Sequence, residues 1–412
     1  MRLTNSCQNE RGAALIISLM FLAILGLLGI TAVVMTTTDM QIGGNYRANA
    51  QAFSDADAGV NYAIAMMEAG LKASPQTFSL PTTVGGTSAL TYTVPSGFSF
   101  SISDITMLGA NTYSFTSTGS GPGNAQALVA ATFSVSSPFN YGIFGVIGMA
   151  MSGNGRTDSY NSSVGPYTWA THSTNGDVGT NATGAGAISL SGNAKVYGDA
   201  QVGVGGDPST AITTSGNAAV VPPGQKLAAD EAKDMTPLAL PSGGIPRSAW
   251  SLSANDSETI YSGTYRLPGI SITGNGVGEI SGDVTLYVTG HITISGNGRL
   301  SVLAGGSLTI YVSGNVIISG NGITNNTSYP EDLQIYGTST CASITIHGNA
   351  DLYGAIYAPA ASVAISGNGD IYGSVIGRSV AISGNGNVHY DEALQTAGPS
   401  TDLQLISWRE EM

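Results

Sequence analysis

Residues 363–386 read VAISGNGDIYGSVIGRSVAISGNG and contain two copies of one short pattern. Each copy begins with a β-branched segment, Val363-Ala364-Ile365 or Val380-Ala381-Ile382, and runs directly into Ser-Gly-Asn-Gly. A short strand that enters a turn at a fixed register, coil after coil, is what a parallel β-helix requires. The stretch therefore predicts a β-solenoid.

The Ser-Gly-Asn motif, or a close variant, recurs from residue 152 onward, and its later copies follow one another at intervals of about one solenoid turn. Glycine adopts the left-handed backbone conformation without steric cost, and asparagine tolerates it better than most residues. Stacked coils would place the asparagines above one another, so that each side-chain amide bonds the next. The repeat-turn asparagines expected in this ladder are Asn154, Asn193, Asn217, Asn275, Asn297, Asn321, Asn349, Asn368 and Asn385.

Alignment of the last coils predicts two further columns of side chains. Two carboxylates are too few to indicate a Ca²⁺ site, so we predict no metal site and no cofactor. The four histidines also lack metal-ligand spacing. The two columns are Asp351, Asp370 and Asn387 in one and Tyr353, Tyr372 and His389 in the other.

An apolar run without charge spans residues 13–35. At about 1.5 Å per residue it can cross a hydrocarbon core of about 30 Å. Arg2 and Arg11 precede the run and Asp39 follows it, which orients the N-terminus toward the cytoplasm. A secretory signal peptide would have a shorter apolar region with a cleavage site behind it. Here the run continues into an amphipathic helix, and a plain signal anchor stays open as an alternative.

Glu10-Arg11-Gly12 stands directly before this run. The arrangement resembles the class III signal of type IV pilins, which implies that a prepilin peptidase cuts between Gly12 and Ala13. With Gly43-Gly44-Asn45-Tyr46-Arg47 downstream, residues 11–70 resemble the N-terminal domain of PilX-type minor pilins. Major pilins carry Glu five residues after the cut. Ile17 stands at that position, which implies a minor subunit.

The chain is expected to be mainly β. Its N-terminal helix is expected to break locally at Gly43-Gly44, because each glycine costs about 1 kcal/mol in a helix. Alternating residues predict a small sheet after the helix, and prolines predict an irregular stretch within the repeats. The expected domains are a leader (1–12), a pilin-like helix (13–73, membrane span 13–35), a small β-meander head (74–140), a right-handed parallel β-helix (141–395, with an irregular excursion over 218–262) and a C-terminal tail (396–412) that caps the open end of the solenoid.

Composition excludes several classes of function. Only 9% of the 412 residues are charged and the formal net charge is −13, which argues against nucleic acid as a partner. The acidic residues of the repeats are scattered, and no Gly-x-Ser-x-Gly elbow or Walker motif occurs. We therefore predict no catalytic activity, with a polysaccharide-cleaving β-helix enzyme as the rival class.

These observations together predict a minor pilin or pseudopilin that takes part in the assembly of a type IV pilus or related filament. Its expected partners are the inner membrane, other pilins and prepilin peptidase. It is expected to cross the inner membrane once, with the bulk of the chain periplasmic, or extracellular after assembly. The alternative is a surface adhesin or carbohydrate-binding module on a membrane anchor, which would bind a surface glycan or host ligand.

Overall fold

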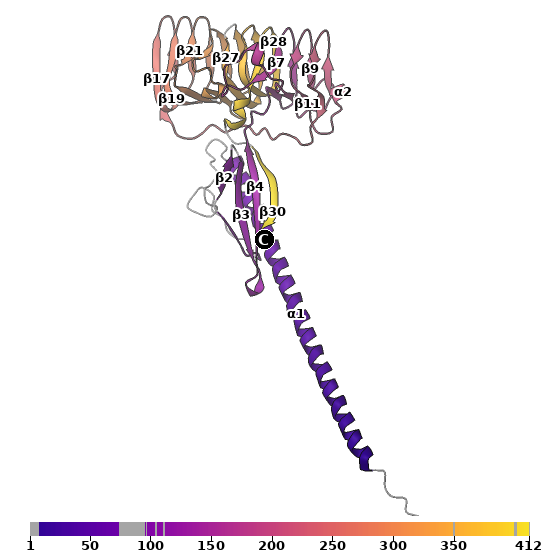
Figure 1. The fold of residues 1–412 in the computed structure, drawn as a ribbon. Coiled ribbons are helices and arrows are strands. Elements are labelled where there is room, and N and C mark those ends of the chain that lie inside the picture. The colour runs from indigo at the N-terminus through magenta and orange to yellow at the C-terminus, as the bar shows by residue number, and fades with distance from the viewer. Residues whose placement is uncertain are drawn as a thin grey trace, which may run out of the picture.

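The computed structural model describes residues 8–73, 95, 97–103, 105–109, 112–348, 351–398 and 402–411. Within them, a long helix leads into a small antiparallel sheet, the head, and a large parallel solenoid lies beyond it (Figure 1). The predicted mainly β fold, with its N-terminal helix, small head and parallel β-helix, is confirmed.

Helix α1 (Gln8–Ala73) is a single helix of 66 residues, about 100 Å long at 1.5 Å per residue. Contrary to expectation, it does not break at Gly43-Gly44. Glycine weakens a helix but keeps its N–H donor, so the ladder of hydrogen bonds continues through both residues. The first part of the expected leader, residues 1–7, lies outside the described residues.

The C-terminal part of α1 packs on the head sheet, whose strands run in the order β1-β3-β4-β30, with β2 paired to β3. Apolar residues at helical spacing, from Ala56 to Met67, form a core with Phe115 and Phe133. Strand β3 approaches α1 so closely that a Cβ on Gly119 would lie 2.0 Å from the Ala52 carbonyl oxygen. The strands are β1 (Phe100–Ile102), β2 (Thr106–Gly109), β3 (Thr112–Ser120), β4 (Gln126–Ser136) and β30 (Asp402–Glu411).

The C-terminal tail does not cap the solenoid, as the sequence had predicted for residues 396–412. Its strand β30 pairs antiparallel with β4 and completes the head sheet. Leu403 and Leu405 lie opposite Val135 and Phe133, so the apolar residues of the tail pack on the head. The solenoid is thus an insertion between two neighbouring strands of the head.

The solenoid contains 25 described strands in one largely parallel arrangement. Its interior is a continuous core made mainly of buried Val, Ile and Leu side chains from most of the strands. The first half of the solenoid comprises β5 (Ile143–Gly145), β6 (Met149–Met151), β7 (Arg156–Tyr160), β8 (Val178–Gly179), β9 (Ile188–Leu190), β10 (Lys195–Val196), β11 (Ala200–Val202), α2 (Pro208–Ala211), β12 (Ile212–Thr214), β13 (Ala219–Val220) and β14 (Lys226–Ala228).

The second half of the solenoid contains longer strands, several of which bend around a corner. Short 3₁₀ turns lie in the head at Pro122–Asn124, in the first half of the solenoid at Trp169–Thr171, and in the second half at Pro330–Asp332 and Glu392–Thr396. The strands are β15 (Ile245–Pro246), β16 (Trp250–Leu252), β17 (Ser257–Leu267), β18 (Ile270–Ile272), β19 (Val277–Val288), β20 (Ile292–Ile294), β21 (Arg299–Val302), β22 (Ser307–Val312), β23 (Val316–Gly320), β24 (Ile323–Asn325), β25 (Leu333–Gly337), β26 (Ser343–Gly348), β27 (Leu352–Gly367), β28 (Ile371–Gly384) and β29 (Val388–Asp391).

The coils do not stack in simple chain order. The chain enters the solenoid at its middle, and the first half stacks outward from β5, β6 and β7 to β14 (Figure 1). The second half begins at the opposite end with β15 and β16 and stacks back toward the middle. There β28 pairs with β5 and β6, and β29 pairs with β7. We call this junction between the last and first coils the seam.

Residues 229–244 connect the two halves along the side of the solenoid that faces the head (Figure 1). Leu238 is buried there against a cluster of aromatic side chains that includes Tyr336 and Tyr357. The irregular excursion is therefore narrower than the predicted 218–262, because β13 to β17 all lie wholly or partly in that range and belong to the solenoid. Of the prolines in this range, Pro222 and Pro223 lie in the turn between β13 and β14, Pro246 lies on the terminal strand β15, and the others, Pro237 and Pro241, lie in the connection. None of these positions needs a backbone donor for an inner strand.

Candidate functional site

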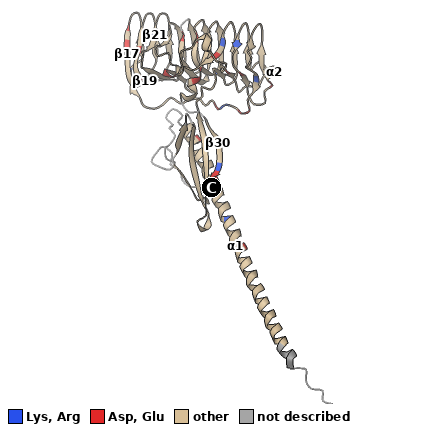
Figure 2. Ribbon diagram, viewed as in Figure 1, with Lys and Arg blue, Asp and Glu red and all other residues tan. Residues whose placement is uncertain are grey.

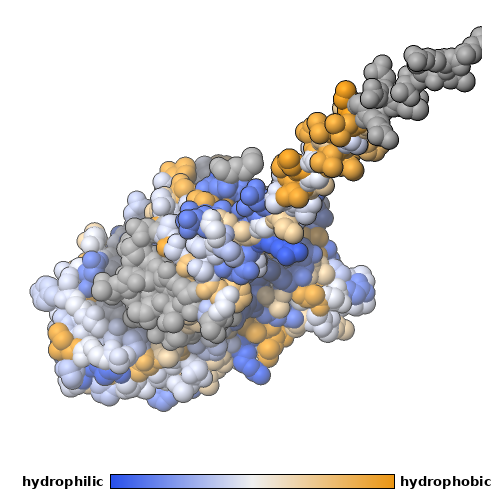
Figure 3. All heavy atoms as spheres, turned by 90° about the horizontal axis from the view of Figure 1, so that it is seen from below, coloured by the Kyte–Doolittle hydropathy of each residue, from blue (hydrophilic) through white to orange (hydrophobic). Residues whose placement is uncertain are grey.

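The N-terminal half of α1 is an exposed apolar rod. Within the described residues, α1 is a helix long and apolar enough to cross a membrane, and none of its most apolar window is buried. Leu15 is 67% exposed and Leu22 is 75% exposed. The predicted cleavage residues Gly12 and Ala13 lie near the beginning of this helix. Apolar surface continues along α1 where it leaves the head (Figure 3). An exposed apolar surface of this extent is typical of a site that contacts a membrane or another protein.

The repeat-turn asparagines form ladders along one corner of the solenoid. Asn385 donates to Asn368 over 2.8 Å and accepts from Asn154 over 2.7 Å, so the ladder crosses the seam. It continues through Asn193 to Asn217. These contacts link coils through side-chain amides on the exposed surface.

A second ladder runs through the other half of the solenoid. Asn297 donates to Asn275, and Asn275 donates to Asn255, each over 3.0 Å. Sequence reasoning missed Asn255 because Ala254 stands where the motif has glycine. Asn321 bonds the backbone carbonyl of Asn297 instead of its side chain. Asn349 lies outside the described residues.

The columns predicted from the last coils are present. Tyr353 and Tyr372 stack in parallel with ring centroids 4.2 Å apart, and Tyr372 pairs with His389. In the other column the Asp351 carboxylate accepts from the Asp370 amide over 2.9 Å. The described residues contain no group of three or more His, Cys, Asp or Glu side chains arranged to hold a metal ion.

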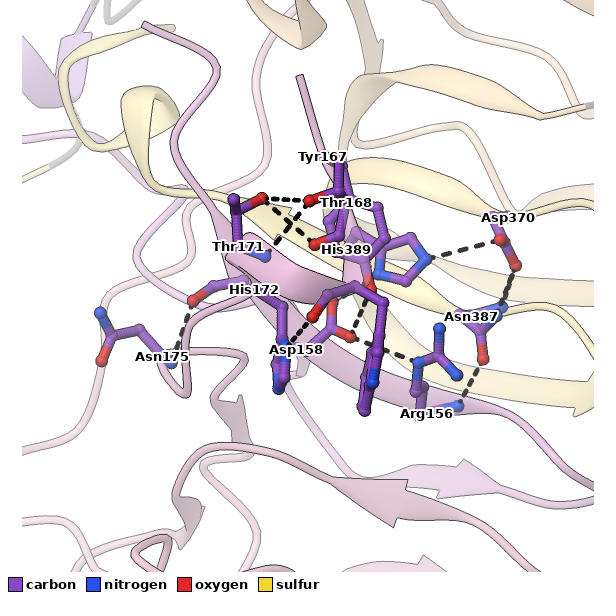
Figure 4. Close-up of polar contacts among 12 residues, drawn as sticks. Arg156, Asp158, Tyr167, Thr168, Thr171, His172, Asn175, Asp370, Asn387 and His389 are labelled. Atoms are coloured by element: carbon purple, nitrogen blue, oxygen red, sulfur yellow. Dashed lines mark hydrogen bonds and ion pairs between the residues drawn. The ribbon is translucent and has the colours of Figure 1, made fainter. Parts of the chain in front are cut away.

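A cluster of charged and aromatic side chains lies at the seam (Figure 4). Val388 belongs to the solenoid core, so its neighbour His389 points outward. His389 Nδ1 lies 2.5 Å from Asp158 Oδ1, and neither side chain is exposed. Tyr167 covers the imidazole, with ring centroids 3.8 Å apart, and donates its hydroxyl to Asp158 over 2.8 Å.

Two further charges complete this cluster. His389 Nε2 lies 3.5 Å from Asp370 Oδ2, an ion-pair distance without hydrogen-bond geometry. Arg156 Nε lies 3.3 Å from Asp158 Oδ2. We call Arg156, Asp158, Tyr167, Asp370 and His389 the seam cluster. Sequence reasoning found its Asp370 and His389 but missed Asp158, which is 231 residues from His389 in the chain.

The electrostatics of the seam cluster favour a charged imidazole. Burial lowers the pKa of His389, but the carboxylates of Asp158 and Asp370 outweigh burial and hold that pKa above 6.5. Burial raises the pKa of Asp370, but His389 and the amides of Asn387 outweigh burial and hold it below 3.8. A buried cation between carboxylates is a structural ion pair, and Tyr167 covers its imidazole.

A loop of residues 161–177 covers the seam cluster and encloses a cavity of about 420 Å³. Trp169 in this loop stacks on His172 at 4.0 Å, and the Arg156 guanidinium lies 4.5 Å from the centre of its ring. The cavity is lined by Tyr160, Asn161, Val164, Gly165, Pro166, Thr168, Thr171, Ser173 and Glu392. Hydroxyl groups, one carboxylate and an aromatic ring therefore surround a space of the size that small ligands occupy.

A second cavity of about 460 Å³ lies on the strand face of the solenoid at its middle. Its lining is mostly glycine, alanine and serine, with the larger apolar side chains Ile147, Met149 and Val380. Figure 2 shows how sparse charges are over the solenoid. This cavity offers backbone and small side chains but no charged group.

An exposed apolar N-terminal helix, the head sheet on its C-terminal part and an inserted β-solenoid define a pilin-like protein. Residues 11–61 match the family described as PilX N-terminal, which confirms the resemblance seen in the sequence. Residues 225–397 match a family described as Domain of unknown function (DUF7305). That second match covers the returning half of the solenoid.

Two solved structures are similar over much of their length. One is the competence-associated pilin ComZ from Thermus thermophilus, with 12% identity, a TM-score of 0.22, and 88% of this chain and 97% of that chain covered. The other is the DUF3494 domain of Shewanella frigidimarina ice-binding protein_1, with 10% identity, a TM-score of 0.29, and 61% and 95% covered. No curated protein matches the chain.

Proposed function

We propose that the chain is a minor pilin or pseudopilin that enters a type IV pilus or related filament through α1. One observation carries this proposal: the N-terminal half of a single helix is apolar and unburied, while its C-terminal half forms the core of the head. The same helix can therefore lie in the inner membrane before assembly and among other helices afterwards.

Processing by prepilin peptidase between Gly12 and Ala13 is part of the proposal. The solenoid is then carried outward as a spacer or binding surface. Both strands that join it to the head, β4 and β30, pair with each other up to Ser136 and Asp402. A double-stranded joint of this kind would present the solenoid in a defined orientation.

N-terminal sequencing of the mature protein tests the processing step. We expect Ala13 as the first residue, and Gly12→Val should leave the leader attached and exclude the chain from sheared filaments. Gly26→Ala is the matched control, because a Cβ at Gly26 would meet nothing within 4 Å. A mature protein that begins at another residue would refute the processing claim.

Glycan binding is a second candidate function, favoured by the cavity under residues 161–177. Its hydroxyl groups and the ring of Tyr160 are groups that can hydrogen-bond and stack on a saccharide. Glycan arrays with the full chain in detergent, compared with Thr168→Val, test this function. Binding that the substitution does not change would place the glycan elsewhere, and absence of binding would leave the spacer role.

A further inference from the structure

Strand β30 extends the head sheet beyond the area that α1 covers. In the order β1-β3-β4-β30 it is an edge strand. A helix is about 10 Å wide and neighbouring strands lie about 4.8 Å apart, so one helix covers about two or three strands. The sheet therefore has room beside α1 for another element over β30.

Apolar side chains of β30 lie on the side of the sheet that faces α1. Leu405 lies opposite Phe133 and Trp408 lies opposite Ala131, and opposite residues in antiparallel strands share a face. Phe133 and Ala131 belong to the core under α1. Yet Leu405 and Trp408 are 43% and 41% exposed. We call these two residues the β30 shelf.

The free edge of β30 is poorly suited to an added strand. Its register shifts between Leu405 and Ser407, which marks a bulge in the middle of the strand. Arg409 and Glu411 follow, with charged atoms 3.7 Å apart. Bulges and charges at an edge oppose pairing with another strand, so the partner of the shelf is not a β-strand.

A helix lying beside α1 fits the shelf. Trp408 stands edge-on to Phe53 of α1, with ring centroids 5.7 Å apart, so the shelf and α1 form one apolar corner. Packed helices lie about 8–10 Å apart, which would place a second helix over β30. We propose that the β30 shelf binds the N-terminal helix of a neighbouring pilin-type subunit.

The chain itself shows that such helices have the required chemistry, because the apolar part of its own α1 is unburied throughout. The inference rests on the proposed function and adds the contact by which the head would hold a neighbour. It gives the C-terminal strand, which follows the whole solenoid in the chain, a role in assembly.

Site-specific photo-crosslinking of the full chain in filament-producing cells tests the contact. A benzophenone amino acid replaces Leu405 or, as the matched control, Arg409, which is 76% exposed and lies on the opposite face of β30. We expect Leu405 to give adducts whose linked peptide comes from the N-terminal helix of a pilin. Arg409 should give none.

The outcomes separate this inference from the proposed function, because recovery in sheared filaments is measured in the same cells. A chain that enters filaments without an adduct at Leu405, or with equal adducts at both positions, refutes the shelf contact alone. An adduct to a pilin helix without recovery in filaments supports the contact and refutes the filament role. Absence of both refutes both.

A substitution gives an independent readout. Leu405→Asp introduces a charge at a position that is 43% exposed, so the head should still fold. We expect recovery in filaments to fall about tenfold, with unchanged amounts of protein in the membrane, while Arg409→Asp has no such effect. Equal recovery of the Leu405→Asp and unchanged chains would overturn the proposal.

Discussion

In each repeat turn the glycine and the asparagine have different structural roles. The glycine takes the left-handed conformation, with φ 70° at Gly320 and 100° at Gly384. A Cβ on Gly320 would also lie 1.9 Å from the carbonyl oxygen of Gly296 in the next coil. The asparagine supplies the amide that links coils. The sequence predicted both roles, and the structure adds the close approach of neighbouring coils, which leaves no room for a side chain at Gly320.

Among the ladder residues, Asn385 is the one whose loss we expect to destabilise the seam most. It bonds Asn368 in its own half and Asn154 in the other. Asn385→Ala should lower the free energy of unfolding by about 1 kcal/mol, because both bonds are exposed and each is worth about that or less. Denaturant unfolding of the full chain in detergent measures this. Asn326→Ala, an exposed asparagine outside the ladder, should change it far less.

The seam cluster should make stability depend on pH through His389. The pKa of His389 lies above 6.5 in the folded chain, so its contribution is present below 6.5 and is lost as pH rises through the folded pKa. The pKa of Asp370 lies below 3.8, so its contribution is present above 3.8 and is lost as pH falls through its folded pKa. The seam should therefore be most stable between about pH 4 and 6.5.

Hydrogen exchange in peptides from residues 371–391, followed from pH 6 to pH 9, checks this dependence after correction for the intrinsic rate. Protection should fall as pH rises in the unchanged chain. His389→Gln should be less protected at pH 6 but nearly independent of pH. His347→Ser, which restores the repeat residue at an exposed position, serves as the control. Equal pH dependence in all three chains would contradict the role of His389.

Among the elements, the repeated strands were the easiest to predict and the tail was the hardest. Each solenoid strand carries its own signal, since a β-branched segment runs into a glycine turn, and the columns from Asp351 to His389 follow from alignment alone. The tail also carries an apolar pattern in its sequence. However, its partner β4 lies on the far side of the solenoid insertion, with Ser137 and Ala397 in contact across 260 residues of chain. Local pattern cannot specify such a pairing.

Removal of β30 should therefore destabilise the head and spare the solenoid. A chain that ends at residue 401 loses Leu403 from the head core and the strand that pairs with β4. The head should lose at least about 2 kcal/mol, the usual cost of one buried leucine. Hydrogen exchange in residues 112–136 should accelerate, while that in residues 277–312 should not. Acceleration in residues 277–312 instead would favour the cap that the sequence had predicted.

For the whole molecule, the order of the coils is the feature that the sequence could not reveal. Every coil carries nearly the same pattern, so any coil could stack on any other. The structure joins the last coil to the first because the insertion must begin and end beside the neighbouring strands β4 and β30. This topology places the buried pair Asp158 and His389 at the seam, where the ladder pattern alone would predict only another Asn contact.

This topology also predicts that the two halves of the solenoid hold together without their connection. Ala381 pairs with Ala150 and Val388 pairs with Thr157 across the seam, and a continuous apolar core runs beneath. A protease site inserted after Glu231, at an exposed part of the connection, should give two fragments that stay associated under native conditions. Native mass spectrometry of the cut chain should show one species, which separates only in denaturant.

Adding His389→Ala to the cut chain should promote separation, since the substitution leaves Asp158 buried without its partner. Fragments that part at once after cleavage would mean that the connection, and not the seam, holds the halves together.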